Sequence, residues 1–448
     1  MASAAEQLAA NLNFGAFAKA TELKKRIWFT LGALIVFRLC SYIPLPGIDT
    51  EAMRQIFEQA RGGVLGMFNV FAGGALERMS IIALNIMPYI SASIIVQLLT
   101  SMSPALGQLK KEGEAGRKKL NQYTRYGTVV LTAVQAYGLA VGLEGWGGQG
   151  GVSAVIDPGM MFRATTVITL VGGTMFLMWL GEQITSRGVG NGISLIIMAG
   201  IVAELPRAFA GTLELGRTGA LSTGIIIGVI ALIVAVIIGI VFFERAQRRV
   251  LIQYPKRQVG NKMFQGDSSH MPLKLNTAGV IPPIFASSLL LMPLTIAGFS
   301  GQGGPEWLTQ FNAVLGHGQP LYMFLYAALI VFFCFFYTAV VFNPEETADN
   351  LKRYGGFIPG IRPGQRTAEY LDFILTRLTV IGSAYLVVIA LIPEFLTARF
   401  SIPYLFGGTS LLIVVNVTMD TVAQIHGHLL AHQYEGLVKK ARLRGGRR

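Results

Sequence analysis

The chain has 448 residues, of which 52% are hydrophobic and only 14% are charged, and its formal net charge is +13. A soluble protein normally carries about 25% charged residues, so this composition excludes an ordinary soluble protein and indicates that much of the surface faces lipid. The only two cysteines, Cys40 and Cys334, lie far apart in apolar stretches and offer neither a disulfide framework nor the spacing of a metal site.

Ten stretches are long and apolar enough to cross a membrane as helices. A helix needs about 20 residues at 1.5 Å each to cross a hydrocarbon core of about 30 Å. The predicted spans are residues 27–45, 81–102, 124–143, 164–181, 193–210, 221–243, 275–297, 320–342, 374–393 and 405–427. Glu204, Pro206 and Arg207 interrupt the fifth span, and the tenth ends near Asp420 and His426.

One apolar segment between the first two spans is too short to cross. Residues 63–75 read GVLGMFNVFAGGA and follow a polar, helix-like stretch. Such a segment must lie at the interface, re-enter the membrane, or sit inside a protein-lined cavity. The residues alone favour an amphipathic helix on the membrane surface.

The basic residues predict the topology. Of the 37 Lys and Arg residues, 27 fall in the segments that lie inside when the N-terminus is cytoplasmic, and seven fall on the opposite side. Positive charge accumulates in cytoplasmic loops, so both termini are predicted to be cytoplasmic. The predicted organisation is a cytoplasmic N-terminus (1–26), an N-terminal half (27–210), a C-terminal half (221–430) with cytoplasmic loops at 244–274 and 343–373, and a basic cytoplasmic tail (431–448).

Ten spans divide into five and five around the loop at 244–274. An odd number of spans in each half gives the halves opposite orientations, as in inverted-repeat membrane proteins. The fold class predicted on this basis is an all-α membrane protein with ten transmembrane helices in two inverted five-helix halves.

The chain lacks the sequence signatures of common enzymes. There is no Walker-type loop, no H-E-x-x-H and no G-x-S-x-G. His428 and His432 are spaced i, i+4 but have no acidic partner, and the centres of six of the spans carry no Asp or Glu. Ion-coupled transporters usually need an ionisable residue deep in the membrane. The prediction is therefore a protein that is not an enzyme, with no catalytic residues, no cofactor and no metal site.

Four stretches stand out by their polar and glycine-rich pattern. Residues 83–97 read ALNIMPYISASIIVQ, with Pro88 in the interior of the second span, where it would bend the helix. Residues 181–194 read GEQITSRGVGNGIS, whose glycines suit a tight turn before a helix. Residues 342–350 (FNPEETADN) and 360–364 (GIRPG) form a loop shaped by proline and glycine.

In this order and spacing, the four stretches closely resemble the SecY family, whose members are the central subunits of the bacterial protein-conducting channel. The resemblance covers residues 23–440. It implies two five-helix halves around a central pore, plugged by the short segment after span one, which replaces the surface-helix interpretation. The implied plug residues are Leu65, Met67, Phe68, Asn69, Phe71, Gly73 and Gly74. The implied ring of apolar residues at the waist of the pore is Ile86, Ile90, Ile193, Ile197, Ile284 and Ile413.

The resemblance also implies a lateral gate between spans two and three and spans seven and eight. Ser91, Gln97 and Asn276 would line this gate, and a hydrogen bond between Gln97 and Asn276 would latch it closed. The basic loops after spans six and eight would dock a ribosome or the motor ATPase SecA. The implied docking residues are Arg249, Lys256, Arg257 and Arg362.

Three positions depart from the family pattern. Asn261-Lys262 stands where consecutive arginines are frequent, Glu345 replaces a residue that is often basic, and Asn85 stands where glycine is usual. None of these departures is expected to touch the pore ring.

The preferred hypothesis is a gated channel in the bacterial inner membrane. It would pass unfolded secretory preproteins across the membrane. It would also release signal sequences and membrane-protein helices sideways into the lipid. SecE and SecG would be its accessory subunits. The alternative is a secondary transporter of a small solute, which inverted halves would also suit. An intramembrane hydrolase has no recognisable nucleophile or metal set.

Overall fold

The structure is a computed structural model of the whole chain. It describes residues 21–59, 69, 72–146, 153–219, 222–255, 257–259, 262–264, 268–299, 319–400 and 408–445.

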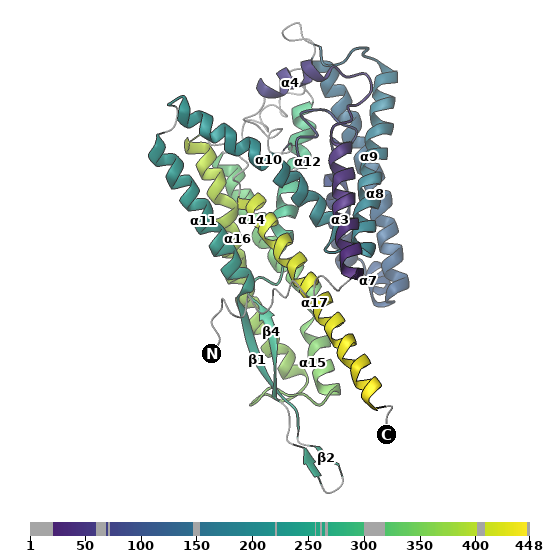
Figure 1. Cartoon of the computed structure of the whole chain (residues 1–448), viewed down its shortest axis with the longest axis vertical. Coiled ribbons are helices and arrows are strands. Elements are labelled where there is room, and N and C mark those ends of the chain that lie inside the picture. Colours follow the sequence, from purple (N-terminus) through teal and green to yellow (C-terminus); the bar gives the residue numbers. More distant parts are fainter. Residues whose placement is uncertain are drawn as a thin grey trace.

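Long helices make up most of the described chain (Figure 1). They are α3 (Thr21–Cys40), α4 (Thr50–Gln59), α6 (Met87–Met102), α7 (Pro104–Lys111), α8 (Glu114–Trp146), α9 (Met160–Arg187), α10 (Gly192–Arg217), α11 (Thr223–Arg245), α12 (Ile281–Phe299), α14 (Pro320–Val341), α15 (Pro344–Arg353), α16 (Gln365–Phe400) and α17 (Gly408–Gly445). Four short strands lie between α11 and α12: β1 (Gln247–Gln253), β2 (Arg257–Val259), β3 (Lys262–Phe264) and β4 (Ser268–Lys274).

A helix occupies most of each predicted span. Among the described residues, six helices are long and apolar enough on their own to cross a membrane, namely α8, α9, α10, α11, α14 and α16. A seventh is added if α6 and α7, which are bent by 106° at their junction, count as one span. The count of ten membrane crossings therefore stays a prediction.

The second span differs most from its predicted boundaries. Its first six residues, 81–86, form turns, and α6 begins only at Met87. Pro88 thus lies in the first helical turn, where its missing N–H costs no helical hydrogen bond. The predicted bend at an interior proline is therefore wrong.

Two other spans also differ from expectation. Glu204, Pro206 and Arg207 do not interrupt the fifth, because α10 continues through them to Arg217. In the seventh, α12 begins at Ile281 rather than at residue 275, so Asn276 lies in the turn before the helix.

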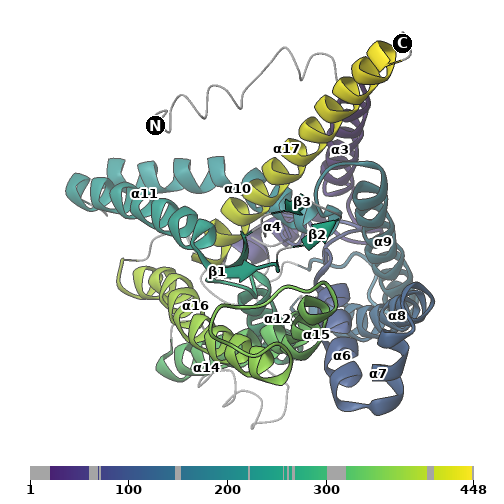
Figure 2. The same ribbon diagram turned by 90° about the horizontal axis from the view of Figure 1, so that it is seen from below.

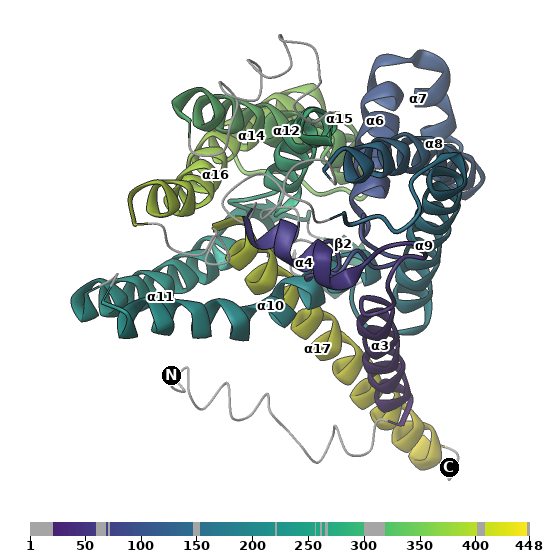
Figure 3. The same ribbon diagram turned by 90° about the horizontal axis from the view of Figure 1, so that it is seen from above.

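The helices form a bundle with its polar extensions at one end. The strands, α15 and the C-terminal end of α17 project from the lower end in Figure 1, and α4 lies at the opposite end. From below, α6, α8 and α9 form one group and α12, α14 and α16 another, while α10 and α11 extend to the left and α17 runs from the middle of the bundle to the upper right (Figure 2). From above, α4 crosses the middle of the bundle (Figure 3). Helix α12 contacts both α6 and α8, and α17 contacts α3, α10, α11 and α16.

One hydrophobic core runs through the bundle. It includes side chains from α3, the 72–86 turns, α6, α8, α9, α10, α12, α14, α16 and α17. A second, smaller core lies beneath the strands and joins Val250 of β1, Leu273 of β4, Ile358 and the first turns of α16. Strand β1 pairs antiparallel with β4 from Gln247 opposite Lys274 to Gln253 opposite Ser268. Strands β1 and β4 of the predicted loop at 244–274 thus pack on α16, and we call these two strands, with the loop between α15 and α16, the ordered extension.

Candidate functional site

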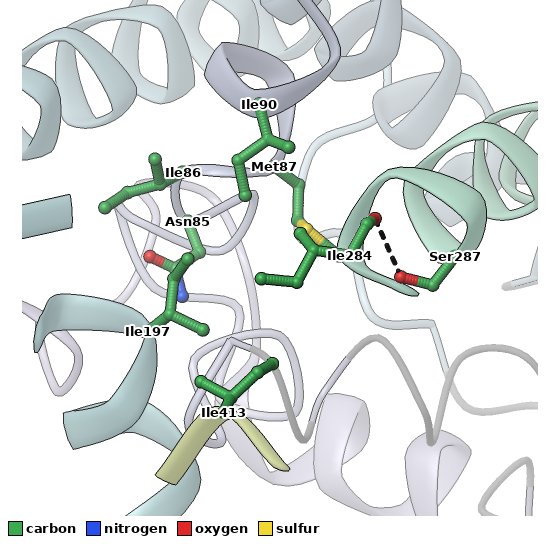
Figure 4. Close-up of a pocket in the computed structure, with 8 residues that line it drawn as sticks. All are labelled: Asn85, Ile86, Met87, Ile90, Ile197, Ile284, Ser287 and Ile413. Atoms are coloured by element: carbon green, nitrogen blue, oxygen red, sulfur yellow. Dashed lines mark hydrogen bonds between the residues drawn. The ribbon is translucent and has the colours of Figure 1, made fainter. Parts of the chain in front are cut away.

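Five isoleucines from separate parts of the chain surround one small cavity in the middle of the bundle (Figure 4). Ile86 and Ile90 come from the start of α6, Ile197 from α10, Ile284 from α12 and Ile413 from α17. These are five of the six residues that the resemblance assigns to the pore ring. Asn85, Met87 and Ser287 complete the lining.

The sixth predicted ring residue, Ile193, is not part of this lining. It lies one turn before Ile197, at the start of α10, where the side chain of Asn191 accepts hydrogen bonds from the first backbone N–H groups. The Cγ1 atom of Ile193 packs against Gly181 of α9. If Gly181 carried a side chain, its Cβ would lie 3.1 Å from this atom. Close packing of α9 on the start of α10 therefore keeps Ile193 out of the cavity.

The local backbone explains how α6 presents its isoleucines. The turns before α6 end at Asn85, whose φ is +49° and whose N–H donates to the carbonyl oxygen of Ile82 at 2.8 Å. Ile86 then caps the helix, and its carbonyl oxygen accepts from the N–H of Ile90 at 3.1 Å. This places Ile86 and Ile90 one turn apart on the same side.

The cavity is closed to anything larger than a water molecule. It has about 10 Å³ of space open to the centre of a water-sized sphere, which is room for about one water. A constriction lined by alkyl groups excludes water and ions by dewetting. The five isoleucines therefore form a closed, mainly apolar constriction that a polypeptide could pass only after the helices separate.

Three residues of the lining were missed from the sequence. Ser287 lies three residues after Ile284, on the same face of α12, so helical spacing could have found it. No comparable spacing marks Met87 or Asn85. The expectation that Asn85 would not touch the ring is wrong, because the turn at this residue directs its amide into the cavity.

A group of charged residues anchors the segment that precedes α6. Two arginine side chains, from Arg38 in the last turn of α3 and from Arg78, donate to the carbonyl oxygen of Gly73 at 2.6 and 3.2 Å. Both also lie near Glu204 of α10, with N···O distances of 4.0 and 3.7 Å. The Tyr42 ring lies under both guanidinium groups, 4.3 Å from that of Arg78 and 5.2 Å from that of Arg38.

A second ion pair ties the same segment to α10. Arg207 makes a bidentate contact with the buried carboxylate of Glu77, at 2.7 and 2.8 Å. Asn69 accepts from the Glu77 N–H at 2.9 Å and donates to its carboxylate at 3.3 Å. We call Arg38, Glu77, Arg78, Glu204 and Arg207 the charge network.

Backbone contact reinforces the charge network. Gly73 has a φ of +64°, and a Cβ there would lie 2.7 Å from the Cα of Gly200 in α10. Of the predicted plug residues, Asn69, Gly73 and Gly74 thus lie where the predicted plug segment is held by these contacts. Leu65, Met67, Phe68 and Phe71 lie outside the described residues.

The seam between α6 and α12 does not contain the predicted latch. The amide of Asn276 donates to Glu244 at 2.7 Å and to the carbonyl oxygen of Gly279 at 3.0 Å. That of Gln97 donates to Ser93 of its own helix at 3.3 Å. The two bonds of Asn276 hold it in the turn before α12, so the predicted Gln97–Asn276 bond is not formed in this structure.

Other contacts lie at this seam and beside it. The hydroxyl of Ser288 in α12 donates to the sulfur of Met87 in α6 at 3.9 Å, and Lys110 of α7 donates to the carbonyl oxygen of Val340 in α14 at 3.2 Å. Ser91 is buried in α6. Of these two hydrogen bonds, the one from Ser288 to Met87 joins α12 to α6, and the one from Lys110 joins α7 to α14 beside the seam.

Two of the four predicted docking residues fall on the ordered extension. Arg249 is exposed on β1, and Arg362 is exposed in the loop between α15 and α16, with surface hollows on both of its sides. Gln253 and Phe357 exchange two backbone hydrogen bonds of 2.9 Å, which join this loop to β1. Arg257 begins β2, whereas Lys256 lies outside the described residues. Within the described ranges, no three His, Cys, Asp or Glu side chains group into a metal site.

Comparisons with known proteins agree with this geometry. The family model described as SecY matches residues 80–422. The chain is 56% identical over 429 residues to a protein of Vibrio cholerae named "Protein translocase subunit SecY", covering 95% of this chain and 96% of that protein. It is 57% identical over 425 residues to the protein of that name from Escherichia coli K12, with the same coverage.

Solved structures share the fold. One described as "The structure of a protein conducting channel" matches with a TM-score of 0.63 at 18% identity, over 91% of this chain and 92% of that one. Another, described as "Sec61 in the Canine ribosome-channel complex from the endoplasmic reticulum", matches with a TM-score of 0.61 at 18% identity, with the same coverage. The predicted helical membrane-channel fold class is confirmed by this likeness.

Proposed function

Because this chain belongs to the SecY family, we propose that it forms the gated channel through which unfolded proteins cross the membrane. The observation that carries the proposal is the closed constriction, in which five isoleucines from four helices meet at the centre of the bundle. An apolar ring seals against ions and offers a passing peptide no polar group to bind. A secondary transporter of a small solute is not favoured, because relatives that are more than half identical over nearly the whole chain are named protein translocase subunits.

The pore would open by separation of α10, α12 and α17 from the start of α6. The segment from residue 63 to 75 would act as the plug, with its base held by the charge network. Separation of α6 from α12 would release apolar signal sequences and membrane-protein helices into lipid. The weak Ser288–Met87 contact supports this seam as the lateral gate.

The partners and location follow from the same proposal. The ordered extension with Arg249 and Arg362 would dock a ribosome or the motor ATPase SecA, and SecE and SecG would accompany the chain. The chain itself would catalyse no reaction. The excess of Lys and Arg in these loops supports a bacterial inner-membrane location in which this extension and both termini would face the cytoplasm.

A stalled secretory chain should crosslink to a photoreactive residue at position 86, 284 or 413, because these side chains line the constriction. The same probe at position 193 should label at least several-fold less, because Ile193 faces α9. The yield of crosslinked preprotein, measured on gels, checks both expectations. Absence of labelling at all three lining positions during transport would contradict the assignment of this cavity as the pore.

Arg362→Glu should slow transport driven by the motor roughly tenfold or more, because charge reversal on a docking surface opposes association. The variant should still insert into the membrane at the normal level, because Arg362 is exposed. Arg54→Glu reverses the same charge on exposed α4, at the other end of the bundle, and serves as the control. Normal transport by Arg362→Glu, or an equal loss in Arg54→Glu, would remove the docking role.

A further inference from the structure

Side-chain hydrogen bonds stiffen the link between strand β4 and helix α12. Strand β4 ends at Lys274 and α12 begins at Ile281, and residues 275–280 join them without helix or strand. The side chain of Asn276, which is 5% exposed, bonds twice to Gly279 within this link. Its amide oxygen accepts from the Gly279 N–H at 3.1 Å, and its amide nitrogen donates to the Gly279 carbonyl oxygen at 3.0 Å. One side chain therefore holds most of the link in a single turn.

A third bond of Asn276 joins this link to α11. Its amide donates to the side-chain oxygen of Glu244 at 2.7 Å. Glu244 is the last residue but one of α11, and β1 follows at Gln247 from the lower end of this helix (Figure 1). Between the two, the N–H of Leu275 donates to the carbonyl oxygen of Ala246 at 3.0 Å, one position beyond the last pair of β1 and β4. The Glu244–Asn276 bond thus continues the connection between the two strands into the helix bundle.

Helix α16 packs against both segments at this point. A Cβ at Gly382 would lie 2.9 Å from the carbonyl oxygen of Leu275. The ring of Tyr385, one turn later in α16, stacks on that of Phe243 in α11, with the ring centroids 4.5 Å apart. The end of α11 and the link to α12 are therefore parts of one packed unit. We call Phe243, Glu244, Leu275 and Asn276 the junction.

The junction connects the ordered extension to the constriction. Ile284, which lines the cavity, lies in the first turn of α12. Without the side-chain bonds, the link could bend at Gly279, whose φ is +64°. We propose that Glu244 is a positioning residue that makes the start of α12, and Ile284 with it, follow movements of β1 and β4. This inference rests on the proposed function, in which a partner docks on the ordered extension. Glu244 then decides how much of that docking reaches the pore, and the docking itself does not depend on it.

Exchanging the two side chains tests the bond. Asn276→Asp places a second carboxylate opposite Glu244, and like charges repel each other. Adding Glu244→Gln restores a donor opposite an acceptor, with the roles reversed. Glu244→Ala, compared with the conservative Glu244→Gln, makes the same test without adding a charge. Thr277→Ala is the matched control, because its hydroxyl donates to the carbonyl oxygen of Lys274 at 3.2 Å and leaves α11 untouched.

The experiment measures preprotein transport into liposomes that hold the full chain with its partner subunits, over a range of motor concentrations. Asn276→Asp and Glu244→Ala should each lower the maximal rate roughly tenfold, since a buried hydrogen bond to a carboxylate is lost. The motor concentration at half-maximal rate should stay within about twofold, because no charge of the docking surface changes. The double variant should recover most of the maximal rate, and Thr277→Ala should keep it. Arg362→Glu should show the opposite pattern, with a raised half-maximal concentration.

The outcomes separate this inference from the proposed function. Equal maximal rates for Asn276→Asp and the double variant, or for Glu244→Ala and Glu244→Gln, would overturn the role of the bond. A raised half-maximal concentration in Asn276→Asp would also overturn it, because the junction would then shape the docking surface. In either case, normal transport by the wild-type chain leaves the channel function intact. If the wild-type chain with the motor and an intact preprotein shows no transport, the proposed function itself fails.

Discussion

Arg207→Ala should destabilise the closed channel by about 2–3 kcal/mol and raise its resting ion leak by a factor on the order of ten or more. Removing one partner of a buried ion pair costs about 3–5 kcal/mol, because the other charge is left buried. The destabilisation expected here lies at or below the low end of that range, because the Arg207 side chain is about half exposed, at 49%, whereas that of Glu77 is only 6% exposed. Glu77 would then draw water into the base of the plug.

Two further variants make this prediction specific. Arg217→Ala on the same helix breaks an exposed pair with Glu214 and should cost no more than about 1 kcal/mol. Adding Glu77→Gln to Arg207→Ala should recover much of the loss, since the buried charge is gone. Conductance across planar bilayers and thermal unfolding in detergent give the two readouts. Equal effects of the Arg207 and Arg217 changes would show that the ion pair with Glu77 has no special part in closure.

Gly173→Ala should displace the turns that carry part of the constriction and lower the free energy of unfolding by about 3 kcal/mol. Helix α9 packs so closely on the turns before α6 that a Cβ at Gly173 would clash with the carbonyl oxygen of Ile81. The carbonyl group of Ile81 belongs to the backbone and cannot rotate away as a side chain could, so either α9 or the turn must shift. Inserting volume into a packed core costs about 1–3 kcal/mol or more. The shifted turn carries Asn85 and Ile86, so the seal should leak as well.

The neighbouring residue provides the control for this prediction. A Cβ at Gly172 meets no atom within 4 Å, and that residue faces outward from α9. Gly172→Ala should therefore leave both thermal stability and ion leak unchanged, or raise stability slightly, because alanine favours the helix by up to about 1 kcal/mol. If Gly173→Ala behaves like Gly172→Ala, the close approach of α9 to Ile81 is not a constraint on the fold.

The sequence predicted the helices well because lipid imposes a simple rule on them. A segment that crosses hydrocarbon must be apolar and must satisfy its own backbone, and both properties are local in the chain. Helix starts were predicted less well, since α6 and α12 each begin six residues after the predicted start of the span, where turns and bends precede the helix. Pro88 looks like a helix breaker in the sequence, yet it lies in the first turn of α6, where proline favours the helix.

The candidate site depended on contacts that no local pattern encodes. The isoleucine ring came from a family resemblance, since isoleucine is common in membrane helices. Ile193 lies outside the lining of the cavity because helix packing decides which face is inward. Asn276 bonds to Glu244, which lies 32 residues away in the chain. The pairing of Glu77 with Arg207 spans 130 residues. Long-range pairing of this kind follows from the assembled bundle and is invisible to spacing.

Helix α16 gives the channel a mechanical property. It starts three residues after Arg362, shares the small core beneath β1 and β4, and continues for 36 residues to Phe400. At 1.5 Å per residue it is about 54 Å long, which exceeds the thickness of a bilayer with its head groups, about 40–45 Å. Pro393 is the one proline inside α16 and lies near its end, so we expect a push on the loop that holds Arg362 to be carried along the helix as far as this proline and to tilt the C-terminal helices.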